Sequence, residues 1–430
     1  MAVDNWEHIL HLVTGWTLPE RSEITGAKGD SGIPWMNVSI KEIGNSLSPT
    51  NSLGEMGATF QFYTGKGNSV GMYQADISYT DISLGKQFWT RTDFALSNLL
   101  NNHTTVGLAD PVGGAPAGTG GVDMHTFSKV AASFDAAGDF FANRTEILKQ
   151  WLESLGDEQA AWKGKAASVF WNLLDDLHSK YENFTAQLRP PGFQPQNHSL
   201  ANPGYQTTTL HGDSLIGAEL SLHNAIQKLY DQYNKFFWQQ AQPISYTMAD
   251  GSSASQNLPA DPRDIMNQLM ADIANWITGH NWNHVTYTSS GQGGYNGHGT
   301  APTWGTSDGF SSSPSWGNLQ DTSTWSAIAN EAVRRWTTNV QTNLDTPAVP
   351  VVTELQQNWT RVLDPNWNTR FAFEDRATGG GQSVTGLPDV TSLGPNGLPT
   401  GTNPGGLPLT SGGPALNPDG STTGLGPNGL

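Results

Sequence analysis

Apolar residues recur at steps of three and four along two consecutive segments, which is the period of a helix with one apolar face. The first segment runs from residue 124 to 155 and the second from 166 to 188, where Arg189 and a diproline follow. Because proline lacks the backbone donor that a helix needs, the diproline ends the second helix. The pattern predicts two helices joined by a short turn, which is an antiparallel hairpin.

The predicted turn contains the string Ala-Ala-Trp-Lys-Gly, which ends in Trp162, Lys163 and Gly164. Before it, Gly156 suits the left-handed residue that closes a helix, and Asp157 favours the amino end of the next one. We expect the Trp162 indole to fold across the end of the hairpin and Gly164 to admit backbone where a side chain would clash. A Trp that only fills an ordinary helical bundle is the alternative interpretation.

A helix, a Trp-x-Gly turn, an Ala-rich start and a second helix resemble the plan of the WXG100 proteins, small substrates of bacterial type VII secretion. The turn itself is similar to that of the related actinobacterial AAWKG family. The resemblance covers about residues 122 to 188. It implies export without a cleaved signal, pairing of hairpins into four-helix bundles, and a Tyr-x-x-x-Asp/Glu signal that the secretion ATPase reads. Tyr246 and Asp250 form such a string, although the family places it just beyond the second helix.

Helical periodicity continues after the diproline. It predicts helices over residues 215 to 240, 261 to 279, 322 to 344 and 351 to 363. Asp261 and Pro262 form a favourable cap and first position for the second of these. About six helices in the middle of the chain can therefore complete a bundle with the hairpin.

The two ends of the chain follow other patterns. Residues 35 to 40, 58 to 63 and 70 to 79 are short runs of β-branched and aromatic residues, which predict strands, and 88 to 100 add a helix. The rest of the first 115 residues shows no helical pattern. From residue 377 the chain is mostly Gly, Pro, Thr, Ser, Asn and Leu, which predicts a disordered tail that continues past residue 430 in the natural protein.

The predicted fold is mainly α, with a WXG100-like hairpin inside a larger helical bundle. Four parts are expected: a small β-rich or irregular domain, the hairpin, a helical region with an aromatic loop, and a disordered low-complexity tail, over residues 1–115, 116–190, 191–376 and 377–430.

Composition narrows the class of protein. Only 14% of the residues are charged, the formal net charge is −17, and there is no Cys. Such a charge disfavours nucleic-acid binding, and the lack of Cys excludes disulfides and thiol chemistry. We expect no membrane span and no signal peptide, because the N-terminus lacks a basic region and its apolar run is short. The predicted location is outside the cell or on its surface by a leaderless route, with the cytoplasm as the alternative.

Aromatic residues gather between positions 286 and 318 in a Gly-, Ser- and Thr-rich segment. Exposed aromatics on such a frame are a candidate surface for carbohydrate or protein contact, and packing onto the bundle is the favoured interpretation. The residues concerned are Tyr287, Tyr295, Trp304 and Trp316.

Catalytic patterns are weak. His280 and His284 stand four apart, but Gly279 ends the predicted helix there. The surroundings of His298 and Ser307 resemble the motifs of subtilisin-like proteases, yet these two residues lie too close together in sequence for that family. The chain is therefore predicted to have no catalytic residue, cofactor or metal.

Three functions are consistent with these observations. The first is a non-enzymatic, secreted or surface-associated interaction protein, whose partner is the type VII machinery, a WXG-like helix pair or a cell-envelope component. The second is a cell-surface module that binds glycan or protein through its exposed Trp and Tyr residues. The third is an uncharacterised hydrolase.

Overall fold

A computed structural model describes residues 5–66, 69–80, 83–113, 120–156, 163–238, 241–289 and 303–362. The chain separates into two compact units, Met1–Glu374 and Asp375–Leu430. All of the described residues belong to the first unit. The predicted tail lies outside them.

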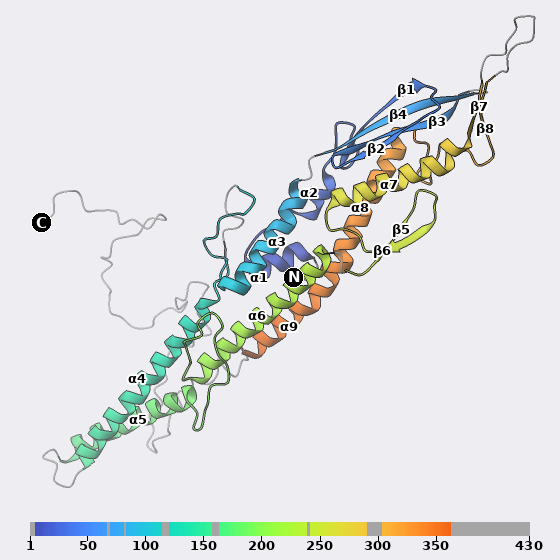
Figure 1. Cartoon of the computed structure of the whole chain (residues 1–430). Helices are drawn as coiled ribbons and strands as arrows, with labels where there is room; N and C mark the ends of the chain where they lie inside the picture. Colours follow the sequence, from blue (N-terminus) through green and yellow to red (C-terminus); the bar gives the residue numbers. More distant parts are fainter. Residues whose placement is uncertain are drawn as a thin grey trace, which may run out of the picture. The chain divides into compact units, whose positions relative to one another are not determined.

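The first unit is mainly helical, as the sequence predicts (Figure 1). Its α-helices are α1 Trp6–Thr14, α2 Arg21–Gly26, α3 Ser83–Asn102, α4 His125–Gly156, α5 Lys165–Leu188, α6 Leu210–Phe237, α7 Pro262–His280, α8 Thr322–Val340 and α9 Thr346–Val362. A π turn, Gln341–Asp345, joins α8 to α9 without a break. The helices predicted along the chain all have counterparts among these.

Four strands form an antiparallel sheet in the order β1-β4-β3-β2, over Met36–Gly44, Ser69–Tyr79, Gly57–Lys66 and Asn51–Gly54. The three predicted runs fall on β1, β3 and β4. Phe60 and Ala75 lie opposite each other and are buried, so one face of the sheet enters the core. Phe60 stacks on Trp325 of α8 with ring centroids 5.7 Å apart.

Two short hairpins complete the described elements. The strands β5 and β6, Ile244–Thr247 and Ser253–Gln256, pair in one of them, and β7 and β8, Val285–Thr288 and Thr303–Thr306, pair in the other.

The N-terminal segment is helical before the sheet begins, and this corrects the expectation of a β-rich or irregular start. The Asn5 side chain accepts a hydrogen bond from His8 N and caps α1, and Gly15 ends the helix with a φ of 73°. The buried residues Trp6, Ile9, Leu10 and Val13 follow the helical period. The signal was present in the sequence but spans only nine residues.

One large core connects the two ends of the first unit. It includes four fully buried tryptophans, from α1, the turn before β1 and α8: Trp6, Trp35, Trp325 and Trp336. The elements before residue 115 therefore share one core with α6 to α9 and have no separate core of comparable size among the described residues.

The helices α4 and α5 lie side by side and antiparallel (Figure 1). Phe141 of α4 stacks on Phe184 near the end of α5, at 4.9 Å between ring centroids. Nearer the turn, Trp171 Nε1 donates to the carbonyl oxygen of Leu152. These two contacts fix the direction and register of the pair.

Candidate functional site

The contact between α4 and α5 is narrow. Leu148 and Leu152 of α4 form a small cluster with Leu174 of α5, and Trp171 and Tyr181 pack at its edge. In α5 the buried residues are Leu174 and Leu188 alone among those described. Most of the apolar stripe of α5 therefore lies outside this contact.

Several large apolar side chains of the two helices are exposed to solvent. Leu173 is 63% exposed and Val169 54% exposed on α5, and Trp151 is 55% exposed on α4. Phe170 and Leu177 extend the same face of α5. Since burying one such side chain contributes about 1.5–3 kcal/mol, this face favours contact with another apolar surface. We call it the α5 face and define it by Ala166, Val169, Phe170, Leu173 and Leu177.

The α5 face is hollowed near the turn. An open depression of about 610 Å³ is lined by five residues, Lys165, Ala166, Val169, Phe170 and Leu173. Ala166, whose side chain is only a methyl group, is the smallest of these residues. Such a hollow beside large side chains suits the knobs-into-holes packing of a second helix.

Charge is distributed unevenly along α5. Lys163 and Lys165 stand at its start, and no carboxylate follows until Asp175 and Asp176. In a chain with a net charge of −17, the first turns of α5 thus contain a lysine and no carboxylate of their own. Lys165 lies beside the start of the α5 face and Asp176 beside its other end, where Asp176 also pairs with Lys180 at 2.8 Å.

One carboxylate gathers several of the hydrogen bonds at the base of the hairpin. Asp135 of α4 accepts hydrogen bonds from Tyr205, Thr207, Thr208 and Thr209 in the segment before α6. Burial disfavours the charged form, but these hydrogen bonds outweigh it and lower the pKa of Asp135. The contact orients the hairpin relative to α6.

The sequence motif of the turn is partly visible. Trp162 lies outside the described residues. Gly164 begins α5 with a φ of 103°, and a Cβ placed there would meet nothing within 4 Å. The glycine is required by its backbone conformation, and the expected close approach of another backbone is absent among the described residues.

The candidate export signal lies in a folded hairpin. Tyr246 is in β5 and only 7% exposed, with the Arg335 guanidinium 3.9 Å from its ring centroid. Asp250 lies in the turn before β6 and is exposed, where its carboxylate accepts from Ser252 N and Oγ. The folded chain thus presents Asp250 to solvent and keeps the Tyr246 ring inside.

The candidate binding aromatics are divided. Tyr287 of β7 is 41% exposed and lies 5.0 Å from Trp304 of β8 between ring centroids. Trp304 is half-buried against Tyr63, and Trp316 packs against the main core. Tyr295 lies outside the described residues. Only Tyr287 of the described members offers a largely open ring.

The histidines named from the sequence lie in turn and helix-end positions. His280 stacks on Trp276, at 5.4 Å between ring centroids. His284 Nδ1 lies 3.3 Å from Ser307 Oγ, but that hydroxyl also donates to the backbone carbonyl of His284 and is exposed. The two residues lie side by side where β7 begins and β8 ends, which is backbone pairing of a hairpin. His298 lies outside the described residues.

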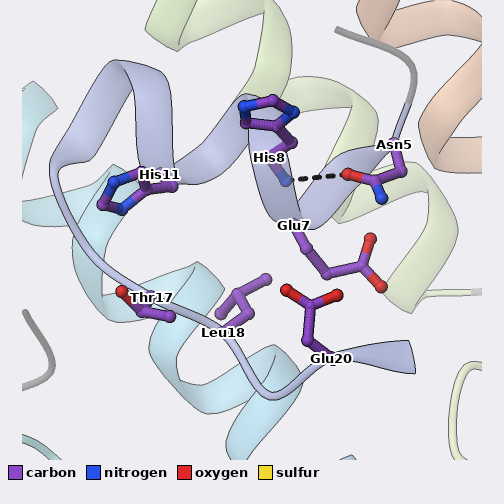
Figure 2. A pocket seen from close by; sticks show the side chains of 7 residues that line it. All are labelled: Asn5, Glu7, His8, His11, Thr17, Leu18 and Glu20. Carbon is purple, nitrogen blue, oxygen red and sulfur yellow. Dashed lines mark hydrogen bonds between the residues drawn. The ribbon is translucent and has the colours of Figure 1, made fainter. Parts of the chain in front are cut away.

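A polar pocket that the sequence did not predict opens beside α1. It has a volume of about 320 Å³ and is lined by Asn5, Glu7, His8, His11, Thr17, Leu18 and Glu20 (Figure 2). The signal available in the sequence was the pair of histidines at positions 8 and 11, three apart on one helix. Among the described residues, no group of three or more His, Asp or Glu side chains has a geometry that holds a metal ion.

Glu7, which lines this pocket, belongs to a largely buried ion network. Arg21 donates to both carboxylate oxygens of Glu7, at 3.1 and 2.9 Å, and to those of Asp345, at 2.8 and 3.0 Å. Burial raises the pKa of Glu7 even though Arg21 acts in the opposite direction. Because Arg21 of α2 binds Glu7 of α1 and Asp345 of the π turn, the network joins these three elements.

No protein-family model, curated protein or solved structure matches this chain. None of the described helices has the length and apolar character needed to cross a membrane.

Proposed function

We propose that this protein is a non-enzymatic interaction protein of the type VII secretion kind, exported or displayed at the cell surface. Its docking element is the hairpin of α4 and α5, and its partner is a second helix pair of the same kind, supplied by a second copy of this chain. The observation that carries the proposal is the α5 face, an exposed apolar stripe on a helix that α4 covers on one side only.

The order of residues along the α5 face favours a second copy as the partner. When two copies of α5 run antiparallel with Phe170 opposite Leu173, Ala166 falls opposite Leu177. A small residue then meets a large one, and the same contact recurs at the other end, as two-fold symmetry requires.

The charges fit the same register. Lys165 of one copy comes within one helical turn of Asp176 of the other, because Asp176 lies two positions from its exact opposite and on the same flank of the helix. Two such contacts form by symmetry. Opposite charges then flank an apolar centre, which steers and aligns association.

Export is tested by fractionating the native host, with and without its type VII ATPase, and blotting cytoplasm, envelope and medium. The proposal predicts ATPase-dependent appearance outside the cell. It also predicts a loss of export for Trp162→Ala, with Trp238→Ala as the matched control because Trp238 is 67% exposed and distant in sequence from the turn. Retention in the cytoplasm in both hosts would overturn it.

A second candidate function rests on the open ring of Tyr287 beside Trp304. Paired aromatics of this kind can stack on the apolar face of a sugar ring. Binding of the protein to isolated envelope glycans, reduced at least tenfold by Tyr287→Ala and unchanged by Trp238→Ala, would support it. Equal binding by both variants would remove it.

A further inference from the structure

Three histidines meet where the hairpin joins the rest of the fold. His103 follows the end of α3, His125 begins α4, and His223 lies on α6. The ring centroid of His103 is 6.1 Å from that of His125 and 6.0 Å from that of His223. These rings, the His103 cluster, come from three different helical segments.

Two imidazoles of the His103 cluster each have a buried nitrogen without a hydrogen bond. The Nδ1 atoms of His103 and His223 are buried, and neither has a hydrogen-bond partner in the described part of the chain. Burial, together with the nearby His103, lowers the pKa of His223, although Glu219 acts in the opposite direction. The surroundings of His223 therefore favour its neutral imidazole over the charged form.

Charged groups around the cluster already have ion-pair or hydrogen-bond partners. Asp123 and Lys129 at the start of α4 pair at 3.6 Å, and the last turn of α3 holds no acidic or basic residue. On α6, Glu219 accepts hydrogen bonds from the segment at 199 to 201. On the neighbouring α9, Glu354 pairs with Lys228 at 2.6 Å.

Backbone hydrogen bonds at and beside His103 hold the residues just before α4. Met124 N donates to the carbonyl oxygen of His103 at 2.8 Å, and Thr105 N donates to that of Val122 at 2.8 Å. His103 itself has a φ of 58°, a left-handed conformation that is uncommon for a residue other than glycine. A force that separates the rings therefore acts directly on the contacts that hold the start of α4.

We propose that the His103 cluster is an acid-sensitive hinge, in which mild acidification charges neighbouring imidazoles and their repulsion releases the start of α4 from α3 and α6. The core around α7 and α8 stays folded. The consequence for partner docking rests on the proposed function of the hairpin, but the opening of the hinge does not.

Hydrogen exchange of the full chain, read by mass spectrometry at pH 7.5 and pH 5.5, tests the hinge. After correction for the intrinsic pH dependence of exchange, protection of residues 122 to 131 is expected to fall about tenfold or more at the lower pH, the factor that one pKa unit represents. Protection of residues 265 to 277 in α7 is expected to stay constant and serves as the internal reference.

The double variant His103→Asn and His223→Gln is expected to abolish the difference, since Asn tolerates the left-handed conformation and neither new side chain titrates. His11→Gln, which changes an exposed histidine elsewhere, is expected to retain it. Equal protection at both pH values, or a loss that persists in the double variant, would overturn the proposal. Self-association measured at pH 7.5 tests the docking function separately, so the failure of one is distinguishable from the failure of the other.

Discussion

Single residues decide how the N-terminal helices are fixed to the rest of the fold. The guanidinium of Arg21 lies between the carboxylates of Glu7 and Asp345, all three of them mostly buried. No sequence pattern predicts this ion network, because Asp345 is more than 300 positions away from both partners and its burial depends on the π turn. Such contacts follow from the tertiary fold alone.

Removing the guanidinium is expected to be strongly destabilising. Arg21→Met leaves two carboxylates buried without a counter-charge, so the free energy of unfolding should fall by about 3–5 kcal/mol in urea denaturation. Arg334→Met is the control and should cost less than about 1 kcal/mol, because Arg334 is 47% exposed and its partner Glu331 keeps the ion pair with Arg335. A similar, small loss for both variants would contradict the role of the network.

The lowered pKa of Asp135 predicts how the free energy of unfolding depends on pH. Its pKa is lower in the folded chain than its ordinary value of 3.8, so its ionised form stabilises the fold above that pH. Asp135→Asn is expected to cost about 1.5–3 kcal/mol at pH 7. The difference in the free energy of unfolding between Asp135→Asn and the unsubstituted chain should shrink as the pH falls through the lowered pKa. Below it, both chains carry a neutral side chain at position 135.

Asp139 supplies the comparison for Asp135. It lies four positions further along the same helix and pairs with Arg189, but its side chain is 66% exposed. Asp139→Asn should therefore change the free energy of unfolding by no more than about 1 kcal/mol at any pH in the same urea titrations. A pH-independent loss for Asp135→Asn would show that its hydrogen bonds do not depend on charge.

At the scale of elements, helical periodicity predicted most of the helices, and the position of α5 shows its limit. The stripe that includes Val169, Leu173 and Leu177 was recognised, but periodicity does not say what covers a stripe. In the structure α4 meets the neighbouring side of α5, through Leu174 and Trp171. The sequence thus predicts the apolar stripe of the α5 face, but only the structure shows that this stripe is exposed.

The join between α8 and α9 was also beyond a local pattern. Two separate helices were expected, at 322 to 344 and 351 to 363, whereas the structure continues through the π turn. Pro347 and Pro350 lack backbone donors, and the wider turn at Gln341–Asp345 precedes them. A proline near a helix end predicts a break unless tertiary contacts hold the two parts in line.

The start of α5 gives a prediction at this scale. Gly164→Ala forces a side chain into a left-handed conformation, so it should lower the free energy of unfolding by about 1 kcal/mol although nothing clashes. Gly279→Ala, in open space on α7 with ordinary helical backbone, should be neutral or stabilising by about 0.5–1 kcal/mol. Thermal denaturation compares the two, and equal effects would contradict the conformational explanation.

At the scale of the whole molecule, the described elements combine a shared core with a hairpin that contributes little to it. Met124 of the hairpin segment is in the main core, whereas Leu148 and Leu152 belong to a separate cluster. The sequence predicted a helical hairpin and a bundle but not how unequally they are buried. That inequality follows from long-range contacts in the main core, such as that of Trp35, just before β1, with Trp336 of α8 at 6.1 Å between ring centroids.

The central claim is that the α5 face joins two copies of the chain, and sedimentation velocity over a concentration series at pH 7.5 tests it most directly. We expect a reversible dimer for the unsubstituted protein, and a monomer at the same concentrations for Leu173→Glu. Leu12→Glu, at an apolar residue of α1 that is 50% exposed, should still form the dimer. A monomer at every concentration, or a dimer that Leu173→Glu leaves intact, would contradict the claim.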